Sequence, residues 1–548
     1  MTPISSSPPR APRSRLARLL ALGCLAWLVG SCQSVPTPVV LPTATTVPTN
    51  TPSATPSRVP ATRTPLPTPA YTAVPPAGQP PMVLPNGPHL FLDDYLIAYR
   101  SQITRVVVPP KRQPEPLITG LLGTNGDNNV DYASVVLRDP QTGHFRMWYH
   151  ADDAKAGQRF SAYVESPDGL NWVRPAVEVS GTRQLPISDI FDQGPDYAVP
   201  SQRYLAIASS DVPPVWLPSL LVSPDGLRWL PINPNIHSPV AYGEIWRIFR
   251  DIGTGGFVLL HRWNRSYDWT DQAGVVYHNT TLDPTSTRLF AYSSSAVLAQ
   301  LDHTRVIFAP GPKDDGQTEF YSMSNVIRRG DYYLATLDIL RNDLTAPGTP
   351  ATITTTVTGQ KYSAYGVGYT VLAWSRDGQH WSRDYASDSY FAPSTNPARW
   401  DHAMAWINSM VEVGDSVYLY YGGYHYGHKV FIDRQIGLAT TQRDRYIAQA
   451  AGSQPGTLRT PLISFNAQSM TLNAAVGNGG QVQLVVLGAN GLPLPGFSPG
   501  DCKAFRADSL AAPVSCAGTF ASLAGRAVYL QFNLTNAQLF AFTLEPAS

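Results

Sequence analysis

Residues 89–450 consist of short apolar runs, many of them alternating with polar residues, that are separated by Gly, Asp and Pro. The runs are rich in Tyr, Trp, Val and Phe, and almost none of them continues with the 3.6-residue period of a helix. Short runs of β-branched and aromatic residues between turn residues are typical of strands. The pattern therefore predicts an all-β chain.

A short motif, Ser-x-Asp-Gly-x-x-Trp, occurs three times in this region, at residues 166–172, 223–229 and 375–381. Asp-Gly between two apolar runs is a strong signal for a β-hairpin, because glycine adopts the backbone conformation that tight turns need. We therefore predict a hairpin at each of these positions. The Trp of each motif is predicted to pack in the interior rather than to form part of a site.

A second repeat places an acidic residue in front of an apolar run and a turn glycine 12, 11, 11 and 13 residues later. The acids are Asp131, Glu244, Glu319 and Asp401, and the glycines are Gly143, Gly255, Gly330 and Gly414. Each unit thus predicts a strand, a turn and a second strand. A fifth, less regular copy covers residues 191–210.

Repeated hairpin units of about 50–80 residues predict a β-propeller, in which each four-stranded blade packs on the next one. Five blades fit residues 89–450. The innermost strands of a propeller line its central channel, so acids that precede these strands reach the same end of the channel. We therefore expect the four acids of the second repeat to face one funnel.

The first 31 residues are interpreted as an export signal. Four arginines, with no acidic residue, precede an apolar run at 19–29 that is shorter than the about 20 residues needed to span a bilayer. The run ends in Val-Gly-Ser-Cys, which resembles the lipobox of bacterial lipoproteins. That resemblance implies that Cys32 is acylated and anchors the chain on the extracellular face of the bacterial membrane. The alternative is a plain secretory peptide with an incidental cysteine.

Residues 32–88 are predicted to be a disordered stalk, since half of the 48 residues from 33 to 80 are Pro or Thr and cannot bury a core. Without residues 1–31 the chain has 36 basic and 39 acidic residues and shows no basic stripe. This charge pattern argues against nucleic acid as a partner, and it leaves the lipid anchor as the one expected membrane contact.

Two of the four cysteines, Cys502 and Cys516, fall in the predicted folded part. Their spacing leaves open whether they form a disulfide or remain two buried thiols. No Cys-x-x-Cys pair is present in the sequence. We therefore predict no metal site and no cofactor, although the sequence leaves open a structural calcium ion in the propeller axis.

Several segments resemble glycosyl hydrolases of the family 32 and family 43 type, which share the five-bladed propeller of invertases and arabinanases. They are the opening HLFLDDYLIAYRSQITRVVVPPKRQPEPLI, the elements FRMWYH, SPDGLNW, EFYSM and RWDHAM, and the closing IGLATTQRDRYIA. The later stretches SFNAQSMTLNAAVGNGG and AGRAVYLQFNLTNAQLFAFTL resemble the β-sandwich module that follows many such propellers. The resemblance implies a five-bladed β-propeller over 89–450 and a small β-sandwich over 451–548. The invertase motif WMNDPNG is absent from this sequence.

Glycosidases need two carboxyl groups on opposite faces of the scissile bond, one protonated and one ionised. The resemblance indicates catalytic residues only by their topological position in the propeller. By position, it implies that Asp131 is the nucleophile or base and that Glu319 is the general acid. Glu244 and Asp401 are then stabilising or orienting groups. The predicted substrate contacts beside these acids are Trp246, Arg247, Tyr321, Trp400 and His402, and Trp406 is a further aromatic residue within a few positions of a site acid that favours a sugar cleft. The competing interpretation is a strand cap or an ion pair for each acid, and packing between blades for each aromatic ring.

Together these expectations describe a monomeric cell-surface glycoside hydrolase that acts on an oligo- or polysaccharide. Two other interpretations stay open, a catalytically inactive carbohydrate-binding propeller and a surface scaffold or adhesion module. Both exo and endo action, with inversion or retention, are compatible with the sequence.

Overall fold

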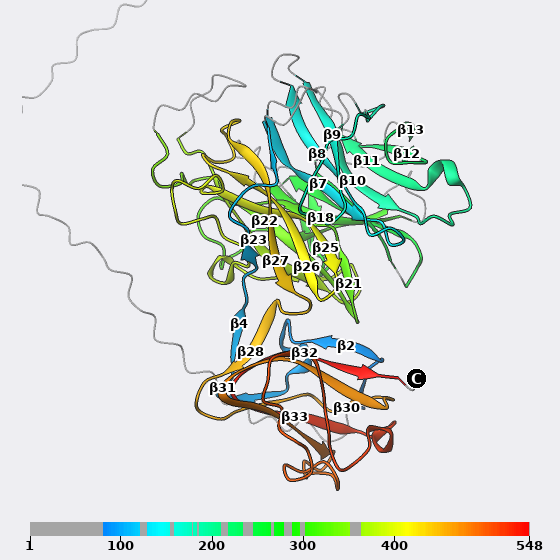
Figure 1. Ribbon diagram of the computed structural model, residues 1–548, viewed down its shortest axis with the longest axis vertical. Coiled ribbons are helices and arrows are strands. Elements are labelled where there is room, and N and C mark those ends of the chain that lie inside the picture. The colour runs from blue at the N-terminus through cyan, green and yellow to red at the C-terminus, as the bar shows by residue number, and fades with distance from the viewer. Residues whose placement is uncertain are drawn as a thin grey trace, which may run out of the picture. The chain divides into compact units, whose positions relative to one another are not determined.

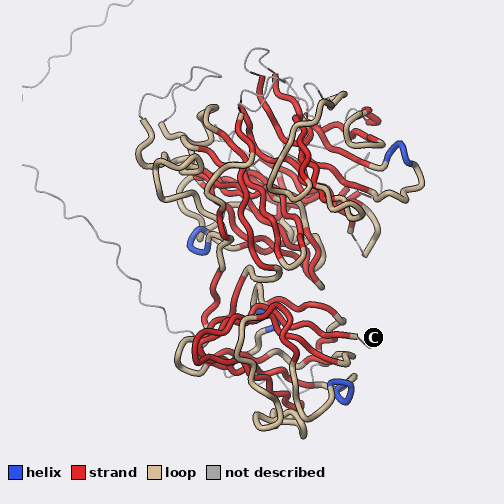
Figure 2. The backbone as a smooth tube through the Cα atoms, viewed as in Figure 1, coloured by secondary structure: helices blue, strands red, loops and turns tan. Residues whose placement is uncertain are grey.

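The computed structural model describes residues 80–120, 129–153, 158–177, 179–182, 186–209, 218–233, 245–251, 253–264, 268–278, 288–295, 302–350 and 363–546. Figure 1 shows that these residues are built into strands and connecting loops. The helices in the described ranges, drawn in blue in Figure 2, are short 3-10 turns. They are η1 (Asp94–Leu96), η2 (Pro200–Gln202), η3 (Ala386–Asp388) and η4 (Phe520–Leu523). The prediction of an all-β chain is confirmed, and no described helix is long and apolar enough to cross a membrane.

The Ser-x-Asp-Gly-x-x-Trp motif closes a tight turn through its own side chains. In the first copy, the backbone N–H groups of Leu170 and Asn171 both donate to Asp168 Oδ1 at 2.8 Å. These donors hold the pKa of the Asp168 carboxyl well below its usual value. Gly169 has a φ of 76°, which favours glycine, and its carbonyl accepts from the Trp172 indole at 3.1 Å. The other two copies repeat these contacts, as predicted.

Three antiparallel sheets follow one another along the chain, and they are described here as groups one to three. Group one contains β7 (Asn129–Arg138), β8 (Phe145–Asp153) and β9 (Gln158–Ser166). Group two contains β10 (Ile187–Asp192), β11 (Tyr204–Ser209), β12 (Pro218–Ser223) and β13 (Leu230–Asn233). Group three contains β14 (Trp246–Arg250), β15 (Phe257–Asn264), β18 (Arg288–Ser295) and β19 (Asp302–Phe308). Between β15 and β18, the strands β16 (Trp269–Thr270) and β17 (Val276–Tyr277) form a separate hairpin.

A ten-stranded sheet contains groups four and five. Group four consists of β20 (Thr318–Met323), β22 (Tyr332–Arg341), β23 (Val367–Ser375) and β24 (Trp381–Arg383), with β21 (Ile327–Arg329) beside β22. Group five consists of β25 (Met404–Val413), β26 (Ser416–Tyr424) and β27 (Arg434–Gln442), with β5 (Lys111–Arg112) and β6 (Ile118–Thr119) on β27. One parallel pair, Gly368 with Met404, joins the two groups. Successive antiparallel groups are the order that a propeller predicts, and the exact number of blades stays a prediction.

The first strand of each group lies toward the first strands of other groups. The Val136 N–H of β7 donates to Ser409 Oγ of β25 at 3.1 Å. The Ile248 N–H of β14 donates to Asp189 Oδ2 of β10 at 2.7 Å. Apolar clusters fill the space between neighbouring groups, such as the cluster that contains Trp148 of β8 and Ala206 of β11. The first strands are therefore the innermost ones, as the sequence predicts.

A second ten-stranded sheet, the terminal sheet, combines both ends of the described chain. Its C-terminal strands are β28 (Ile447–Ala451), β29 (Gly456–Arg459), β30 (Ile463–Ser464), β31 (Ser469–Gly488), β32 (Ser509–Pro513) and β33 (Val528–Glu545). Its N-terminal strands are β1 (Met82–Val83), β2 (Gly87–Leu90), β3 (Tyr99–Ser101) and β4 (Thr104–Val107). Residues 89–107, which the sequence assigns to the propeller, thus pair with the C-terminal module. That pairing covers strand edges that would otherwise be exposed.

Cys502 and Cys516 form a disulfide in the terminal sheet, across a sequence separation of 14 residues. Closing a loop of this length stabilises a fold by about 3 kcal/mol, through the entropy of the unfolded chain. We expect the double substitution Cys502→Ser/Cys516→Ser to lower the free energy of unfolding of the terminal sheet by about that amount in urea denaturation. A reducing agent should have the same effect on the wild type and none on the double variant. Equal midpoints for wild type and double variant would contradict this expectation.

Candidate active site

Two of the four predicted site acids can be placed by their side chains. Glu319 is the second residue of β20, and Asp401 lies shortly before β25. Asp131 lies on β7, but its side chain is outside the described part of the chain, and Glu244 lies outside it altogether. The assignments of Asp131 and Glu244 stay predictions.

Glu319 is a buried carboxylate at the beginning of an innermost strand, with 5% of its surface exposed. Arg288 Nη1 donates to Oε2 at 2.9 Å, and Asn342 Nδ2 donates to Oε1 at 2.8 Å. Arg288 opens β18 and Asn342 follows β22, so two other strands supply these donors. The Arg288 guanidinium also lies over the ring of Tyr321, 4.6 Å from its centroid. Both carboxylate oxygens therefore have N–H donors, which offset the cost of burying a charge.

Aromatic rings and a lysine lie beside this carboxylate. Tyr321 stacks on Trp406 with ring centroids 4.4 Å apart, and His428 meets Tyr321 edge-on at 4.7 Å. Burial lowers the pKa of Lys429, and the nearby charge of Glu319 opposes that shift. The structure thus brings Glu319 together with two aromatic residues named from the sequence, Tyr321 and Trp406, both of which are buried. It also adds His428 and Lys429, which sequence reasoning did not assign to the site.

Asp401 lies in a different environment and is 0% exposed. Arg112 Nε lies 2.8 Å from Asp401 Oδ2, and the Tyr421 hydroxyl donates to the same oxygen at 2.9 Å. Trp400 stacks on Tyr421, with ring centroids 5.4 Å apart. Arg112 belongs to β5, which pairs with the last main strand of group five. These are the surroundings of a structural ion pair, and the role of Asp401 as a site acid stays a prediction.

Two more of the predicted substrate contacts have partners inside the protein. The ring atoms Nδ1 and Nε2 of His402 lie 2.9 and 2.8 Å from the carbonyl oxygens of Ser394 and Pro347. Trp246 stacks on His261 with ring centroids 4.6 Å apart. Burial lowers the pKa of His261 to about 4, so this ring is neutral at pH 7. The observed surroundings are those of packing residues, and substrate contact by Trp246 and His402 stays a prediction.

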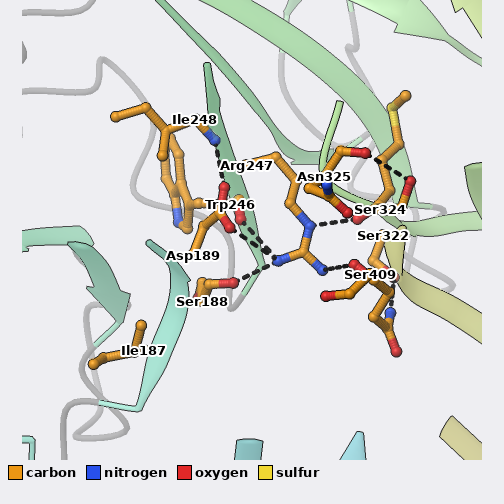
Figure 3. Close-up of polar contacts among 12 residues, drawn as sticks. Ile187, Ser188, Asp189, Trp246, Arg247, Ile248, Ser322, Ser324, Asn325 and Ser409 are labelled. Carbon is orange, nitrogen blue, oxygen red and sulfur yellow. Dashed lines mark hydrogen bonds and ion pairs between the residues drawn. The ribbon is translucent and has the colours of Figure 1, made fainter. Parts of the chain in front are cut away.

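Arg247 reaches the region where the innermost strands meet, as Figure 3 shows, and it is 1% exposed. Its Nη1 donates to the carbonyl of Ser188 and its Nε to the carbonyl of Met323, each at 2.5 Å. Its Nη2 donates to the carbonyl of Asn408 at 3.4 Å. The observed partners of this predicted substrate contact are thus backbone carbonyls of three other innermost strands.

Sequence reasoning missed a buried acid close to this region. Asp338 of β22 is 0% exposed and accepts hydrogen bonds from the hydroxyl groups of Ser322 and Thr370. Asn408 Nδ2 also donates to Asp338 Oδ2, at 3.0 Å. Burial raises the pKa of Asp338 to about 8. An acidic residue inside the apolar run YYLATLDILR is the sequence signal that could have identified it.

The residues that the structure describes contain no candidate metal site. No three or more His, Cys, Asp or Glu side chains are grouped there so as to hold a metal ion. The candidate site in the described residues therefore consists of Glu319, its donors Arg288 and Asn342, and the adjoining rings of Tyr321 and Trp406.

No known protein family matches the sequence, and no curated protein matches it either. The chain is similar to a solved glycoside hydrolase structure with a TM-score of 0.40, 14% identity, and coverage of 61% of this chain and 92% of that one. An N-acetylgalactosamine deacetylase from F. plautii, solved with blood group B trisaccharide, has a TM-score of 0.39, 14% identity, and coverage of 63% and 97%. A GH43 β-xylosidase/α-arabinofuranosidase from a compost microbial metagenome, solved with xylotriose, has a TM-score of 0.37, 13% identity, and coverage of 61% and 95%.

Proposed function

We propose that this chain is a glycoside hydrolase that cleaves an oligo- or polysaccharide at the end of the propeller where the innermost strands begin. The observation that carries the proposal is the environment of Glu319, a carboxylate at the start of β20 with a donor on each oxygen. The stacked pair of Tyr321 and Trp406 adjoins it. A carboxylate fixed in this way is one of the two carboxyl groups that a sugar-cleaving site requires.

The donors of Glu319 also indicate its role. The guanidinium of Arg288 can only donate, so Oε2 of Glu319 acts as an acceptor, and Asn342 Nδ2 donates to Oε1. In that form Glu319 supplies negative charge to the cationic sugar carbon of the transition state. We therefore propose Glu319 as the ionised member of the pair and assign the proton donor to Asp131 or Glu244. This division differs from the sequence-based one, which made Glu319 the acid.

The alternative, a catalytically inactive carbohydrate-binding propeller, is favoured by one observation. Asp401, the other predicted acid whose side chain is described, is fully buried in an ion pair with Arg112. Glu319 is also paired with an arginine, but it keeps 5% of its surface exposed, whereas Asp401 has no exposed surface and is not available to a substrate without rearrangement. The alternative would explain why an acid at this position serves packing instead of chemistry.

A panel of plant and microbial oligosaccharides separates the two functions. The purified chain is incubated with each sugar, and the release of new reducing ends is measured together with binding by calorimetry. Hydrolysis of at least one linkage supports the glycoside hydrolase. Binding without release of reducing ends selects the inactive binding propeller, and neither binding nor release contradicts both.

We further propose that the protein is held on the outer face of the membrane by acylation of Cys32, which lies outside the described residues. Cys32→Ala should release the protein from the membrane fraction into the soluble fraction, because the acyl chains are the proposed anchor. The measurement is fractionation of cells followed by immunoblotting. Ser31→Ala keeps both the cysteine and a small residue before it and should remain in the membrane fraction. Retention of Cys32→Ala in the membrane would contradict the proposal.

A further inference from the structure

Arg247 occupies a position at which three innermost strands present backbone oxygen atoms to one side chain. Figure 3 shows the guanidinium of β14 among residues of the neighbouring strands. Its carbonyl partners are Ser188 of β10, Met323 of β20 and Asn408 of β25. Strands from four of the five groups thus converge on one positive charge.

Further oxygen atoms belong to the same position. Asp189 Oδ1 lies 3.9 Å from Arg247 Nη1, and burial raises the pKa of Asp189 to about 6, against the opposing effect of Arg247. Asn408 contributes its backbone carbonyl, 3.4 Å from Arg247 Nη2. Backbone carbonyl, amide and carboxylate oxygens are the ligands that calcium prefers in proteins. The position therefore has the donor set of a cation site.

We propose that this position is a cation site that the chain fills with the guanidinium of Arg247 in place of a metal ion. Two guanidinium nitrogens already lie 2.5 Å from carbonyl oxygens, so the oxygens are taken by N–H groups. A positive charge here offsets the cost of directing carbonyl dipoles and a carboxylate toward one buried point. The wild-type chain then needs no calcium ion at this position. The inference concerns the fold and is independent of the proposed glycosidase function.

The proposal is tested by removing the guanidinium and supplying a metal ion. Arg247→Ala leaves the oxygen atoms in place and opens the space between them. We expect about 10 mM CaCl₂ to raise the melting temperature of this variant by about 2–3 °C, the shift expected for an ion bound with submillimolar affinity. The wild type should show no calcium-dependent shift. The double variant Arg247→Ala/Asp189→Asn, which also lacks the carboxylate charge, should lose the response.

A matched control and a conservative variant complete the test. Arg250→Ala removes an exposed arginine three positions later on the same strand and should show no response to calcium. Arg247→Lys keeps a positive charge with three N–H donors, so it should fold and also show no response. A folded Arg247→Ala variant without a calcium-dependent shift would overturn the proposal. Failure of Arg247→Ala to fold even in calcium, with Arg247→Lys folded, would overturn it too.

Discussion

Glu319→Gln is expected to lower the turnover of a hydrolysed glycan by about 10²–10⁴-fold while the protein stays folded. The substitution removes the negative charge at the start of β20 and keeps the shape of the side chain. The new amide oxygen can still accept from Arg288. Asn342 can rotate its Oδ1, which has no partner in the described residues, toward the new N–H₂ group. The measurement is kcat and KM for wild type and variant, with thermal melting as the check on folding.

Glu412→Gln is the matched control for this experiment. Glu412 lies on β25, its side chain is 42% exposed, and Arg329 Nε is 3.8 Å from its carboxylate. Such a surface ion pair contributes about 0–1 kcal/mol to stability, so turnover and melting temperature should both stay close to those of the wild type. Wild-type turnover in a folded Glu319→Gln variant would rule out Glu319 as the ionised carboxylate.

Asp338→Asn is expected to remove a strong pH dependence of stability. The folded-state pKa of Asp338 is raised to about 8, whereas an unfolded aspartate has a pKa of about 3.9. Between these values the folded state keeps a proton that the unfolded state has lost. The stability that this proton gives to the folded state is fully present below about pH 4 and is lost as the pH rises to about 8. Asp338 alone should therefore lower the free energy of unfolding by about 1.4 kcal/mol per pH unit in that window.

A neutral asparagine has no proton to lose, so the variant should gain stability relative to the wild type as the pH rises. Its amide can be accommodated, because the Thr370 hydroxyl already has a second acceptor in the carbonyl of Ala405, at 2.9 Å. The measurement is urea denaturation of both proteins at several pH values from 4 to 8. Asp415→Asn, on an exposed ion pair with Arg443, should leave the pH dependence of the wild type unchanged. Parallel curves for wild type and Asp338→Asn would show that Asp338 does not cause the slope.

Local signals in the sequence were sufficient for the strands and hairpins. The turn at Gly169 is specified within seven residues, because Asp168 and Trp172 make the contacts that close it. The spacing of acids and turn glycines also identified the innermost strands, since it reflects the length of one hairpin. The sequence contains no comparable local signal for strand pairing between distant segments. The pairing of β2 with β33 depends on apolar faces that would also fit other strands.

The same distinction applies to the candidate site. Glu319 was found because it has a fixed place in the repeat. Its donors Arg288 and Asn342 lie at the ends of other strands, and only the fold brings them to the carboxylate. Arg247 was predicted from the sequence as a substrate contact, and that role stays a prediction. The sequence shows an arginine next to a tryptophan, whereas its carbonyl partners are set by the backbones of strands β10, β20 and β25.

The terminal sheet has a consequence for how the chain is synthesised. Strand β2 ends at residue 90, and its partner β33 begins at residue 528. A ribosome that adds about 5–20 residues per second needs roughly 20–90 s to cover that interval. Until β28, β29 and β30 are made at residues 447–464, strands β4, β3 and β1 also lack their partners, while groups one to five can already assemble from neighbouring hairpins. A chaperone that binds unpaired strands would therefore find its substrate at residues 82–107 of the nascent chain, and a chain truncated before β28 would leave all of these strands unpaired and prone to aggregation.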